Sequence, residues 1–388
     1  MQNNTLSRAD LSNETGIAKN VHYGDVLIKF GDVLDVSREQ LPMIKDEKIL
    51  DKYKASFLQN GDVIIADTAE DTTVGKCSEI AGLRDEVVLS GLHTIPYRPV
   101  EKFATGYLGY YLNASAYHDQ LIPLMQGIKV TSISKYAMQD TDIVYPKSIE
   151  EQAMIGSYFQ SLDHLITLHQ RKCDQTKNLK KYMLQKMFPQ NGAKVPEIRF
   201  DGYTYDWEQR KFGELYSKVS EKNDLSFGAD KIISVANMYF KEEVKESSDE
   251  YMRTYNVMRL GDIAFEGNKS KNYSHGRFVE NTIGDGIVSH VFDVFRPTTS
   301  YDLLFWKYLI NNEGVMGRIM ARCTNASTMM TNLVASDFLK EKILVPSLKE
   351  QKKIGAYFDS LDHLITLHQR KCDELKKMKK YMLQNMFI

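Results

Sequence analysis

The amino-acid sequence predicts two mixed α/β (α+β) domains separated by two long helices that form an antiparallel coiled coil. Three observations support this fold class. The length of 388 residues allows two or three domains, each large enough to bury a core. A block of 40 residues occurs twice, which predicts an internal repeat with pseudo-two-fold symmetry. Outside this block, both halves carry the turn, strand and helix signals of compact domains.

The repeat occupies residues 149–188 and 348–387, which are identical at 29 of 40 positions with an offset of 199. Neither copy contains proline, and each has a single early glycine, Gly156 or Gly355. Both copies are rich in Leu, Met, Lys and Gln, which favour helices. Each copy is therefore expected to form one helix of about 60 Å.

Apolar residues in both copies recur at alternating spacings of four and three, which is typical of a coiled-coil seam. Two such seams in one chain would most simply pack against each other, and antiparallel packing would place the two equivalent domains at opposite ends. In the alternative interpretation, each helix only covers its own domain. The residues expected on the seam or facing a partner subunit are Gln152, Ile155, Phe159, Leu162, Ile166, Gln351, Ile354, Phe358, Leu361 and Ile365.

The two halves outside the repeat are organised alike. A turn entering a strand is predicted at 60–65 and at 260–265, and a later strand in each half is stopped by proline. A helical stretch follows, and a short apolar strand then ends at Pro146 or Pro346, just before each long helix. The expected boundaries are 1–148 for the first domain, 149–188 for the first helix, 189–206 for a linker, 207–347 for the second domain and 348–388 for the second helix.

The composition is that of an ordinary soluble protein. With 50 basic and 51 acidic residues the formal net charge is −1, which neither indicates nor excludes a nucleic-acid partner, because a local basic face is sufficient. The sequence has no apolar run of membrane-spanning length and no signal-peptide pattern, so a cytoplasmic location is expected. Four scattered cysteines without CxxC spacing make a disulfide framework improbable.

Short motifs carry a resemblance to a known family. Glu-Gln follows a proline closely in each copy, at 151–152 and 350–351, and is followed by Ile-Gly. Ser-Leu-Asp-His-Leu-Ile occurs at 161–166 and 360–365, and residues 207–215 (WEQRKFGEL) resemble the opening of a target-recognition domain. On these residues, the chain resembles the specificity subunits of type I restriction-modification systems.

This resemblance implies a non-catalytic subunit that recognises a bipartite site in double-stranded DNA, with one recognition domain for each half. It implies two modification subunits, which carry S-adenosylmethionine and methylate adenine, and restriction subunits that use ATP and Mg. No cofactor is expected in this chain itself. The first half has no counterpart of 207–215, so its recognition domain is expected to be shortened, or the missing segment to be supplied differently.

The residues agree with the absence of catalysis. No GxxxxGK[ST] phosphate loop, Asp/Asn-Pro-Pro-aromatic run or H-E-x-x-H cluster occurs, so an autonomous methyltransferase or nuclease is disfavoured. His169, Cys173, His368 and Cys372 have the residue types of a zinc site. In-register antiparallel helices would place the two cysteines about 13 Å apart, so no metal site is predicted.

Loops rich in basic, amide and hydroxyl side chains are the candidate DNA contacts, because such side chains bind phosphates and base edges. The strongest is 268–277, whose counterpart in the first half is 71–76; a second pair is 127–135 and 325–332. Each segment alone could be an ordinary solvated loop, but the matched positions favour function. The candidates are Thr72, Thr73, Lys76, Lys129, Thr131, Ser132, Ser134, Lys135, Lys269, Lys271, Asn272, Tyr273, Ser274, His275, Arg277, Ser327, Thr328, Thr331 and Asn332.

Two further patterns have alternative interpretations. A glycine precedes a cation at both 75–76 and 276–277, which would let the backbone approach a phosphate closely. Both long helices carry many cations, including Arg171, Lys172, Lys177, Lys180, Lys181 and their copies. Such a run is usually a solvated face, but attraction to DNA or docking of modification subunits would also use it, and the near-identity of the copies favours docking. The runner-up function is a coiled-coil scaffold without sequence-specific DNA binding.

Overall fold

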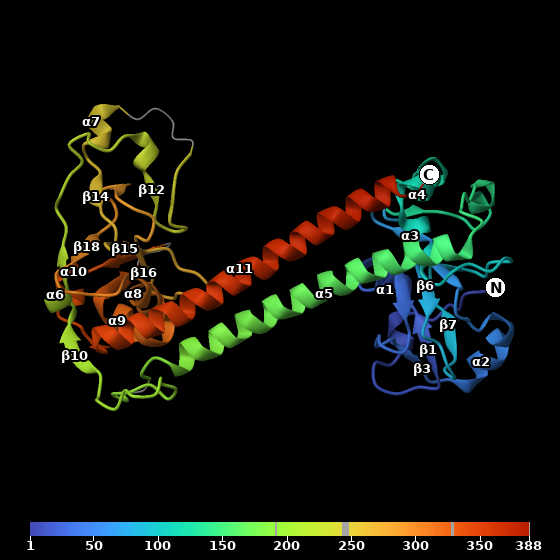
Figure 1. The fold of residues 1–388 in the computed structure, drawn as a ribbon, viewed down its shortest axis with the longest axis horizontal. Helices are drawn as coiled ribbons and strands as arrows, with labels where there is room; N and C mark the ends of the chain where they lie inside the picture. The colour runs from blue at the N-terminus through green and yellow to red at the C-terminus, as the bar shows by residue number, and fades with distance from the viewer. Residues whose placement is uncertain (191, 243–247, 327–329, 388) are drawn as a thin grey trace. The chain divides into compact units, whose positions relative to one another are not determined.

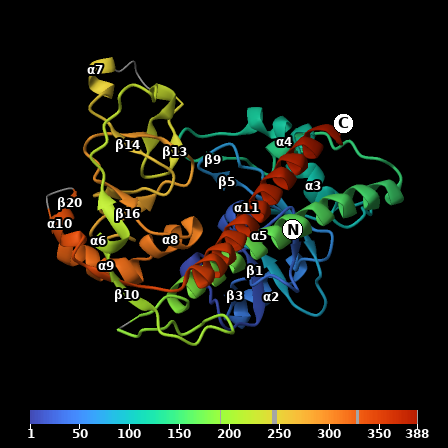
Figure 2. The ribbon, with the colours of Figure 1, turned by 60° about the vertical axis from the view of Figure 1, so that its left-hand side comes forward.

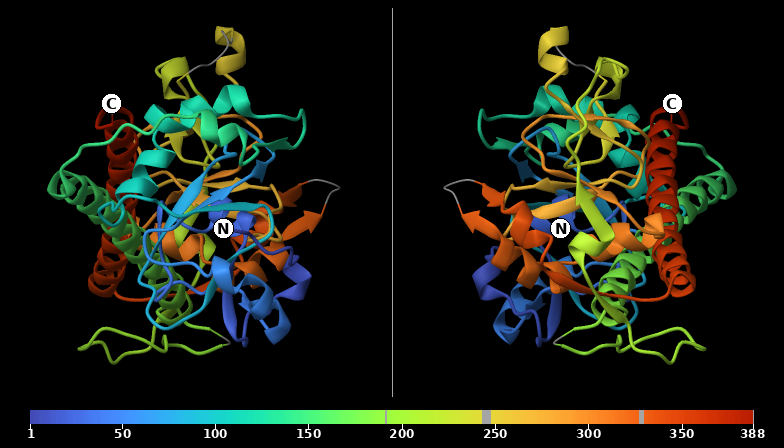
Figure 3. Two further views of the ribbon diagram at one scale, coloured as in Figure 1. Left: turned by 90° about the vertical axis from the view of Figure 1, so that its right-hand side faces the viewer. Right: turned by 90° about the vertical axis from the view of Figure 1, so that its left-hand side faces the viewer.

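The structure of the protein, a computed structural model, describes residues 1–190, 192–242, 248–326 and 330–387. It consists of two compact units: unit 1 comprises Met1–Gln170 and Gln369–Ile388, and unit 2 comprises Arg171–His368. Both long helices contribute residues to both units, because α5 spans Ile149–Lys186 and α11 spans Leu348–Asn385. Figure 3 shows each as one unbroken helix, α5 in green and α11 in red. The two predicted helices are confirmed.

Unit 1 is a mixed α/β unit. Its strands are β1 (Ala18–Val21), β2 (Val33–Asp35), β3 (Met43–Ile44), β4 (Val63–Ala66), β5 (Thr68–Ala69), β6 (Cys77–Ala81), β7 (Val88–Ser90), β8 (Thr94–Tyr97) and β9 (Thr131–Ser132). Its short helices are α1 (Tyr23–Ile28), α2 (Glu47–Tyr53), α3 (Tyr107–Asn113) and α4 (Ser115–Leu121). The main sheet has the order β2-β6-β4-β8, and a second sheet has the order β3-β1-β7. Figure 1 labels β6 of the main sheet and all three strands of the second sheet.

Unit 2 is also mixed. Its strands are β10 (Glu208–Lys211), β11 (Tyr216–Lys218), β12 (Ile233–Ser234), β13 (Tyr239–Phe240), β14 (Asn256–Met258), β15 (Ile263–Glu266), β16 (Arg277–Glu280), β17 (Gly286–Val288), β18 (Val294–Pro297), β19 (Thr324–Ala326), β20 (Thr331–Leu333) and β21 (Lys342–Val345). Its short helices are α6 (Phe212–Leu215), α7 (Asp249–Met252), α8 (Leu303–Ile310), α9 (Glu313–Cys323) and α10 (Ala335–Phe338). The main sheet has the order β11-β18-β15-β16.

The repeat extends into the sheets. In unit 1, β4 lies between β6 and β8 with antiparallel pairing on both sides, and in unit 2 β15 lies between β16 and β18 in the same way. The matched pairs are Val63 with Glu79 and Tyr97, and Ile263 with Glu280 and Phe295. The strands predicted at 60–65 and 260–265 are therefore confirmed, and β6-β4-β8 corresponds to β16-β15-β18.

The long helices complete each core with segments from both copies of the repeat. In unit 1, Phe159 of α5 stacks on Phe387, just after α11, with ring centroids 5.7 Å apart. In unit 2, Phe358 of α11 stacks in the same way on Phe188, just after α5, at 5.9 Å. All four rings are buried. Because the start of one helix meets the end of the other, the two segments run antiparallel within each unit, as predicted.

Two lysines interrupt the apolar seam at equivalent positions. The ammonium of Lys379 donates to Asp163 at 2.5 Å and to Asp32 at 2.7 Å in unit 1. In unit 2, Lys180 donates to Asp362 at 2.5 Å. Each ammonium also lies about 5 Å from the centroid of a tyrosine ring. These two lysines of the predicted charge run are therefore partners within the fold rather than members of a solvated face.

The two buried glutamines on the seam tie each helix to its own domain. Gln152 accepts from the Ala104 amide at 3.0 Å, and its side-chain amide donates to the Pro146 carbonyl at 2.8 Å. Gln351 repeats this arrangement, accepting from the Asp302 amide and donating to the carbonyl of the proline before α11, both at 3.1 Å. These bonds give Gln152 and Gln351 a structural role inside each unit.

One sequence prediction is wrong for the first half. The strand expected before Pro146 does not form, whereas its counterpart before Pro346 is β21. The reason is pairing: β21 is hydrogen-bonded to β10 in unit 2, and β10 lies in the segment that the first half lacks. Without a neighbouring strand to pair with, residues 141–145 do not form a strand.

Two equivalent buried carboxyl groups, Glu79 and Glu280, give a test of pH dependence. Burial, and then the nearby Asp302 carboxylate, raise the pKa of Glu280 to about 9. The unfolded chain releases this proton near pH ~4.3, so wild-type stability should fall as pH rises between that value and about 9. We expect Glu280→Gln to remove this slope and to raise the free energy of unfolding of unit 2 at pH 8 by at least about 1 kcal/mol.

The matched control is Glu79→Gln. Both carboxylate oxygens of Glu79 accept backbone amides, from Gly106 at 2.6 Å and Gly109 at 3.0 Å. A glutamine there leaves one amide without an acceptor, so we expect a loss of about 1–3 kcal/mol at pH 8. Denaturant titrations at pH 5 and pH 8 measure both effects; a Glu280→Gln variant with the wild-type pH slope would contradict the assignment.

Candidate nucleic-acid interface

The structure brings the two candidate loop segments of unit 1 together. Residues 71–76 connect β5 to β6, and residues 127–135 contain β9. β5 and β9 pair antiparallel, with Ala69 opposite Thr131, and they lie side by side in Figure 2. The Ile133 amide extends this contact by donating to the Asp67 carbonyl at 2.9 Å. Two segments that are separated in the sequence therefore form one surface beside the main sheet.

Unit 2 repeats this arrangement. Residues 268–277 connect β15 to β16, and the described part of 325–332 belongs to the β19-β20 hairpin. The Thr331 amide donates to the Gly267 carbonyl at 2.8 Å, and Asn268 forms a bridge with Met330. The candidate residues Ser327 and Thr328 lie outside the described residues. The matched loop positions predicted from the sequence are thus matched neighbours in space.

The hairpin of unit 1 presents an exposed tip. The backbones of Gln126 and Ser132 exchange two hydrogen bonds, of 2.9 and 2.8 Å. Between them, Gly127 has a φ of 115°, and a Cβ there would lie 2.0 Å from the Val130 carbonyl oxygen, so the turn requires glycine. Lys129 is exposed at this tip. An exposed lysine of this kind is accessible to a phosphate.

Lys76 and Gly75 are oriented towards the protein instead. The Lys76 ammonium donates to the carbonyls of Leu27 at 2.8 Å and Phe30 at 3.3 Å, and burial lowers the pKa of this lysine. Gly75 is buried, and a Cβ there would lie 2.4 Å from Leu121 Cδ1. The chain itself fills the space in front of this glycine, so close approach to a phosphate is not needed to explain it.

Arg277 has a comparable environment in unit 2. Its Nε donates to Glu266 at 2.8 Å, and its guanidinium lies 5.1 Å from the centroid of the Tyr273 ring. Glu266 is 8% exposed, so this ion pair is largely shielded from water. Arg277 thus anchors the loop 268–277 to β15, whereas Lys269 and Lys271 of the same loop are exposed.

The remaining candidates differ in exposure. Thr131, Tyr273 and His275 are partly buried, and Thr331 is buried, with its hydroxyl donating to the Gly267 carbonyl at 3.1 Å. The exposed candidates are Thr72, Thr73, Lys129, Ser132, Ser134, Lys135, Lys269, Lys271, Asn272, Ser274 and Asn332. These exposed hydroxyl, amide and ammonium groups form the part of the surface that suits phosphate and base contacts.

One element next to the candidate loops was not predicted from the sequence. The β12-β13 hairpin lies next to the loop 268–277, because Arg277 Nη2 donates to the Ala236 carbonyl at 2.5 Å. At its tip, Tyr239 is 50% exposed and Met238 has a φ of 49°. Non-glycine residues rarely adopt this conformation, and nothing in the local sequence signals it. Exposed aromatic side chains can stack on bases or pack on sugars, so this hairpin joins the candidate surface.

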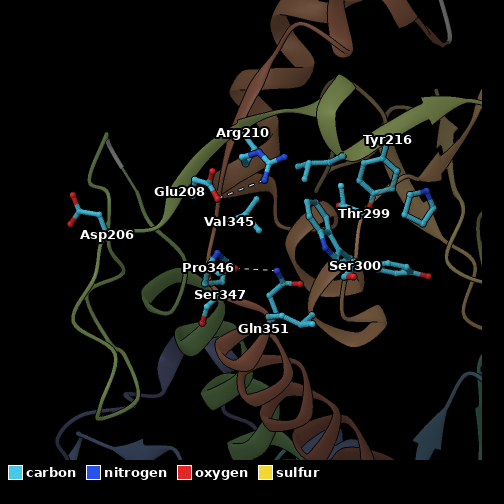
Figure 4. A pocket seen from close by; sticks show the side chains of 15 residues that line it. Asp206, Glu208, Arg210, Tyr216, Thr299, Ser300, Val345, Pro346, Ser347 and Gln351 are labelled. Atoms are coloured by element: carbon cyan, nitrogen blue, oxygen red, sulfur yellow. Dashed lines mark hydrogen bonds and ion pairs between the residues drawn. The ribbon is translucent and has the colours of Figure 1, made fainter.

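A separate cavity of about 470 Å³ lies in unit 2 beside the start of α11. Figure 4 shows Glu208 and Arg210 of β10, Tyr216 of β11 and Gln351 of α11 around it. Arg210 and Glu208 form an ion pair at 3.7 Å. This cavity is formed by the β10-α6-β11 segment rather than by the candidate loops.

Among the described residues, no cluster of three or more His, Cys, Asp or Glu side chains has the arrangement of a metal site. Cys173 and Cys372, the cysteines weighed for zinc, each donate to a backbone carbonyl of the other helix, at Ile365 and Ile166. In the described part of the chain, no helix is both long enough and apolar enough to cross a membrane.

Comparison with known proteins agrees with this arrangement. Residues 205–377 match the family described as "Type I restriction modification DNA specificity domain". The matched residues belong to unit 2 and to the adjoining part of α11, and they make up less than half of the chain. The resemblance to type I specificity subunits that the repeat motifs carry is confirmed.

Two relatives extend the comparison. The "Type I restriction enzyme MjaVIII specificity subunit" of Methanocaldococcus jannaschii is 24% identical over 285 residues, which are 66% of this chain and 64% of that protein. The match thus spans less than two thirds of the relative's length. The crystal structure of a type-I restriction-modification system S subunit from M. genitalium covers 100% of this chain and 93% of its own, with a TM-score of 0.56 and 12% identity. At this identity the likeness shows a shared fold.

Proposed function

We propose that this chain is the DNA-recognition subunit of a type I restriction-modification complex, and that each unit reads one half of a bipartite double-stranded site. The observation that carries the proposal is the repetition of one surface: in each unit, two polar loop segments meet beside equivalent strands. Two related reading surfaces in one chain suit a site with two specified halves.

The exposed side chains suggest which residues contact phosphates and which contact bases. Lys129 in unit 1, and Lys269 and Lys271 in unit 2, would bind phosphates and fix the register on the duplex. Neighbouring amide and hydroxyl groups, such as those of Asn272 and Asn332, would contact base edges in the grooves. Lys76 and Arg277 support the loops from within and are not needed as phosphate ligands.

Methylation of adenine and cleavage of DNA would belong to partner subunits. S-adenosylmethionine, ATP and Mg are assigned to two modification subunits and to restriction subunits, and none to this chain. The exposed cations of the helices, including Arg171 and Lys172 with their copies Arg370 and Lys371, are the proposed docking surface. A repeated surface suits two identical partners.

Two measurements test this function. Co-expression with a modification subunit should yield a stable complex, and selection from a random duplex library at stated salt should recover two constant half-sites around an unspecified spacer. The isolated chain should transfer no labelled methyl group. Stable partner binding with no enriched sequence would favour the coiled-coil scaffold, and methyl transfer by the homogeneous chain would refute the assignment of catalysis to partners.

The phosphate role predicts a salt dependence. Lys129→Ala and Lys271→Ala should each weaken binding to the selected site and reduce the slope of log K against log[salt] by about one unit per lost phosphate contact. Lys102→Ala is the matched control, because Lys102 is also exposed but lies outside both candidate segments. Equal slopes in all three variants and the wild type would show that the loops are solvated connectors.

A further inference from the structure

Unit 2 holds one segment of its own chain, residues 199–218, at three places. The first is an ion pair: Arg199 donates twice to the carboxylate of Glu350, at 2.7 and 2.8 Å. The indole of Trp207 donates to the same carboxylate at 3.3 Å. Glu350 lies near the start of α11 and is only 1% exposed. Its carboxylate is therefore a buried hydrogen-bond acceptor that binds an arginine and a tryptophan.

The other two places are strand edges. β10 pairs antiparallel with β21, and β11 pairs antiparallel with β18 at the edge of the main sheet. Between these strands, the side chains of Phe212, Leu215 and Tyr216 are buried in the core of unit 2. The segment therefore closes unit 2 by adding a strand at each of two edges and an apolar side-chain cluster between them.

Unit 1 has equivalents of the carboxylate and of both strand edges that hold this segment in unit 2. Among the described residues, no segment of the chain binds to any of the three. Glu151 is the counterpart of Glu350 at the repeat offset of 199, and it is exposed, with no hydrogen bond or ion pair to its carboxylate. β8, the counterpart of β18, pairs only with β4 in the described part of the chain. Residues 142–145, the counterpart of β21, have no strand beside them.

The backbone of this unpaired stretch is already oriented for pairing. In unit 2, the Phe212 amide donates to Glu341, which places alternate residues 341, 343 and 345 towards β10. In unit 1, the amides of Asp142 and Val144 donate inward, to Gln120 at 3.0 Å and Tyr111 at 2.9 Å. The alternate amides, at positions 143 and 145, have no partner among the described residues and correspond to those that face β10.

An apolar cavity of about 390 Å³ lies between these edges in unit 1. Pro99 and Ile143 line it, and Ile143 is 44% exposed. The counterpart of Pro99 is Pro297, which lines the cavity of unit 2 together with Leu215 and Tyr216 and lies opposite Tyr216 in the pairing of β11 with β18. In unit 1, the apolar surface that the segment covers in unit 2 is therefore open to solvent.

Charge also favours a basic strand at this position. In unit 2, Lys211 of β10 lies directly opposite Lys342, a like-charge pair. The residue equivalent to Lys342 in unit 1 is Asp142, which is exposed. A strand carrying lysine at the position of Lys211 would meet an opposite charge in unit 1, and opposite charges across a strand pair are stabilising.

We propose that the groove of unit 1 formed by Glu151, residues 141–145 and the outer edge of β8 is a docking site for an extended segment of a partner polypeptide. The partner segment should carry the same kinds of side chain as residues 199–218. These are an arginine and a tryptophan that bind Glu151, a basic strand opposite Asp142, and apolar side chains that fill the cavity. Pro96 in β8 is compatible with this docking. The counterpart of Pro96 on β18, Val294, accepts the Val219 amide through its carbonyl, which proline retains.

A synthetic peptide of residues 197–219 with a fluorescent label tests the proposal on the full chain. Saturable binding to one site is expected by fluorescence anisotropy. Peptide carrying Arg199→Glu should bind at least about tenfold more weakly, because a charge-assisted pair is replaced by repulsion. A chain with Glu151→Arg should show the reverse preference, binding the charge-reversed peptide better than the native peptide. This reciprocal rescue distinguishes docking from a folding defect.

Glu150→Arg is the matched control, since Glu150 is an exposed acid one residue away on the same helix, and it should keep the wild-type preference. Hydrogen exchange should show new protection at residues 141–145 and in β8. Equal affinity of both peptides for every chain would overturn the proposal. Protection confined to unit 2 would also overturn it, because the peptide would then have replaced the resident segment. The test uses no DNA, so its outcome is independent of the proposed recognition function.

Discussion

Replacing Phe387 with alanine is expected to lower the free energy of unfolding of unit 1 by about 3–5 kcal/mol, although this residue follows the last helix of the chain. The ring is 7% exposed and lies 5.7 Å from Phe159, 5.9 Å from Tyr107 and 5.6 Å from Tyr111. Truncation removes these contacts and leaves a cavity that the surrounding rings cannot fill. Unit 2 should be unaffected, because Phe387 belongs to the core of unit 1.

The reciprocal variant is Phe188→Ala, at the equivalent position of the first copy. Phe188 is 1% exposed and packs in unit 2 against Phe305 and Phe358. It should destabilise unit 2 by a similar amount and leave unit 1 intact. Hydrogen exchange of amides in α3 and α8 reports the two units separately. The reciprocal packing would be disproved by a Phe387→Ala variant that lost protection in α8 and kept it in α3.

The packing of the two long helices shows which of their features could be predicted from the sequence and which could not. Composition identified both helices and the 4-and-3 spacing identified their seam, because both are local properties of the sequence, whereas the antiparallel arrangement was inferred from the duplication of the domains. The same spacing presented Lys180 and Lys379 only as interruptions. Their burial depends on carboxylates from distant segments, Asp362 for one and Asp32 with Asp163 for the other. Local patterns do not contain such pairings.

The strand expected before Pro146 failed for a related physical reason. The apolar run Ile143-Val144 has strand propensity, but a strand needs a neighbour, and β10 supplies it only in unit 2. Matched sequence positions in the two halves therefore differ in structure because their partners differ. The same contrast between the halves became the basis for the proposed docking groove.

The candidate interface was predictable in position but not in orientation. Loops at equivalent places in both halves were chosen as candidate DNA contacts, and the structure brings the two segments of each half together, as the pairing of β5 with β9 does in unit 1. The direction of individual cations could not be read in the same way. Lys76 donates to carbonyls at the end of α1, and Arg277 pairs with Glu266, so tertiary acceptors decide where each charge points.

Glu350→Ala is expected to lower the free energy of unfolding of unit 2 by about 3 kcal/mol or more, whereas Glu151→Ala should change that of unit 1 by less than about 0.5 kcal/mol. The two residues are equivalent in the repeat, but their environments differ. Removal of Glu350 leaves the guanidinium of Arg199, which is 15% exposed, and the buried indole of Trp207 without their acceptor. Glu151 is exposed and its carboxylate supports no contact, so little is lost.

Thermal unfolding followed by hydrogen exchange would measure the difference, since about 1 kcal/mol corresponds to roughly 2–4 °C in a unit of this size. The double variant Glu350→Leu with Arg199→Met should recover most of the loss, because apolar side chains of similar volume can replace a buried ion pair. Recovery would assign the effect to the unpaired charge rather than to a disturbed start of α11. Equal destabilisation by Glu350→Ala and Glu151→Ala would mean that a glutamate at this position stabilises the helix itself. It would also contradict the proposed groove, which requires that the carboxylate of Glu151 has no partner in unit 1.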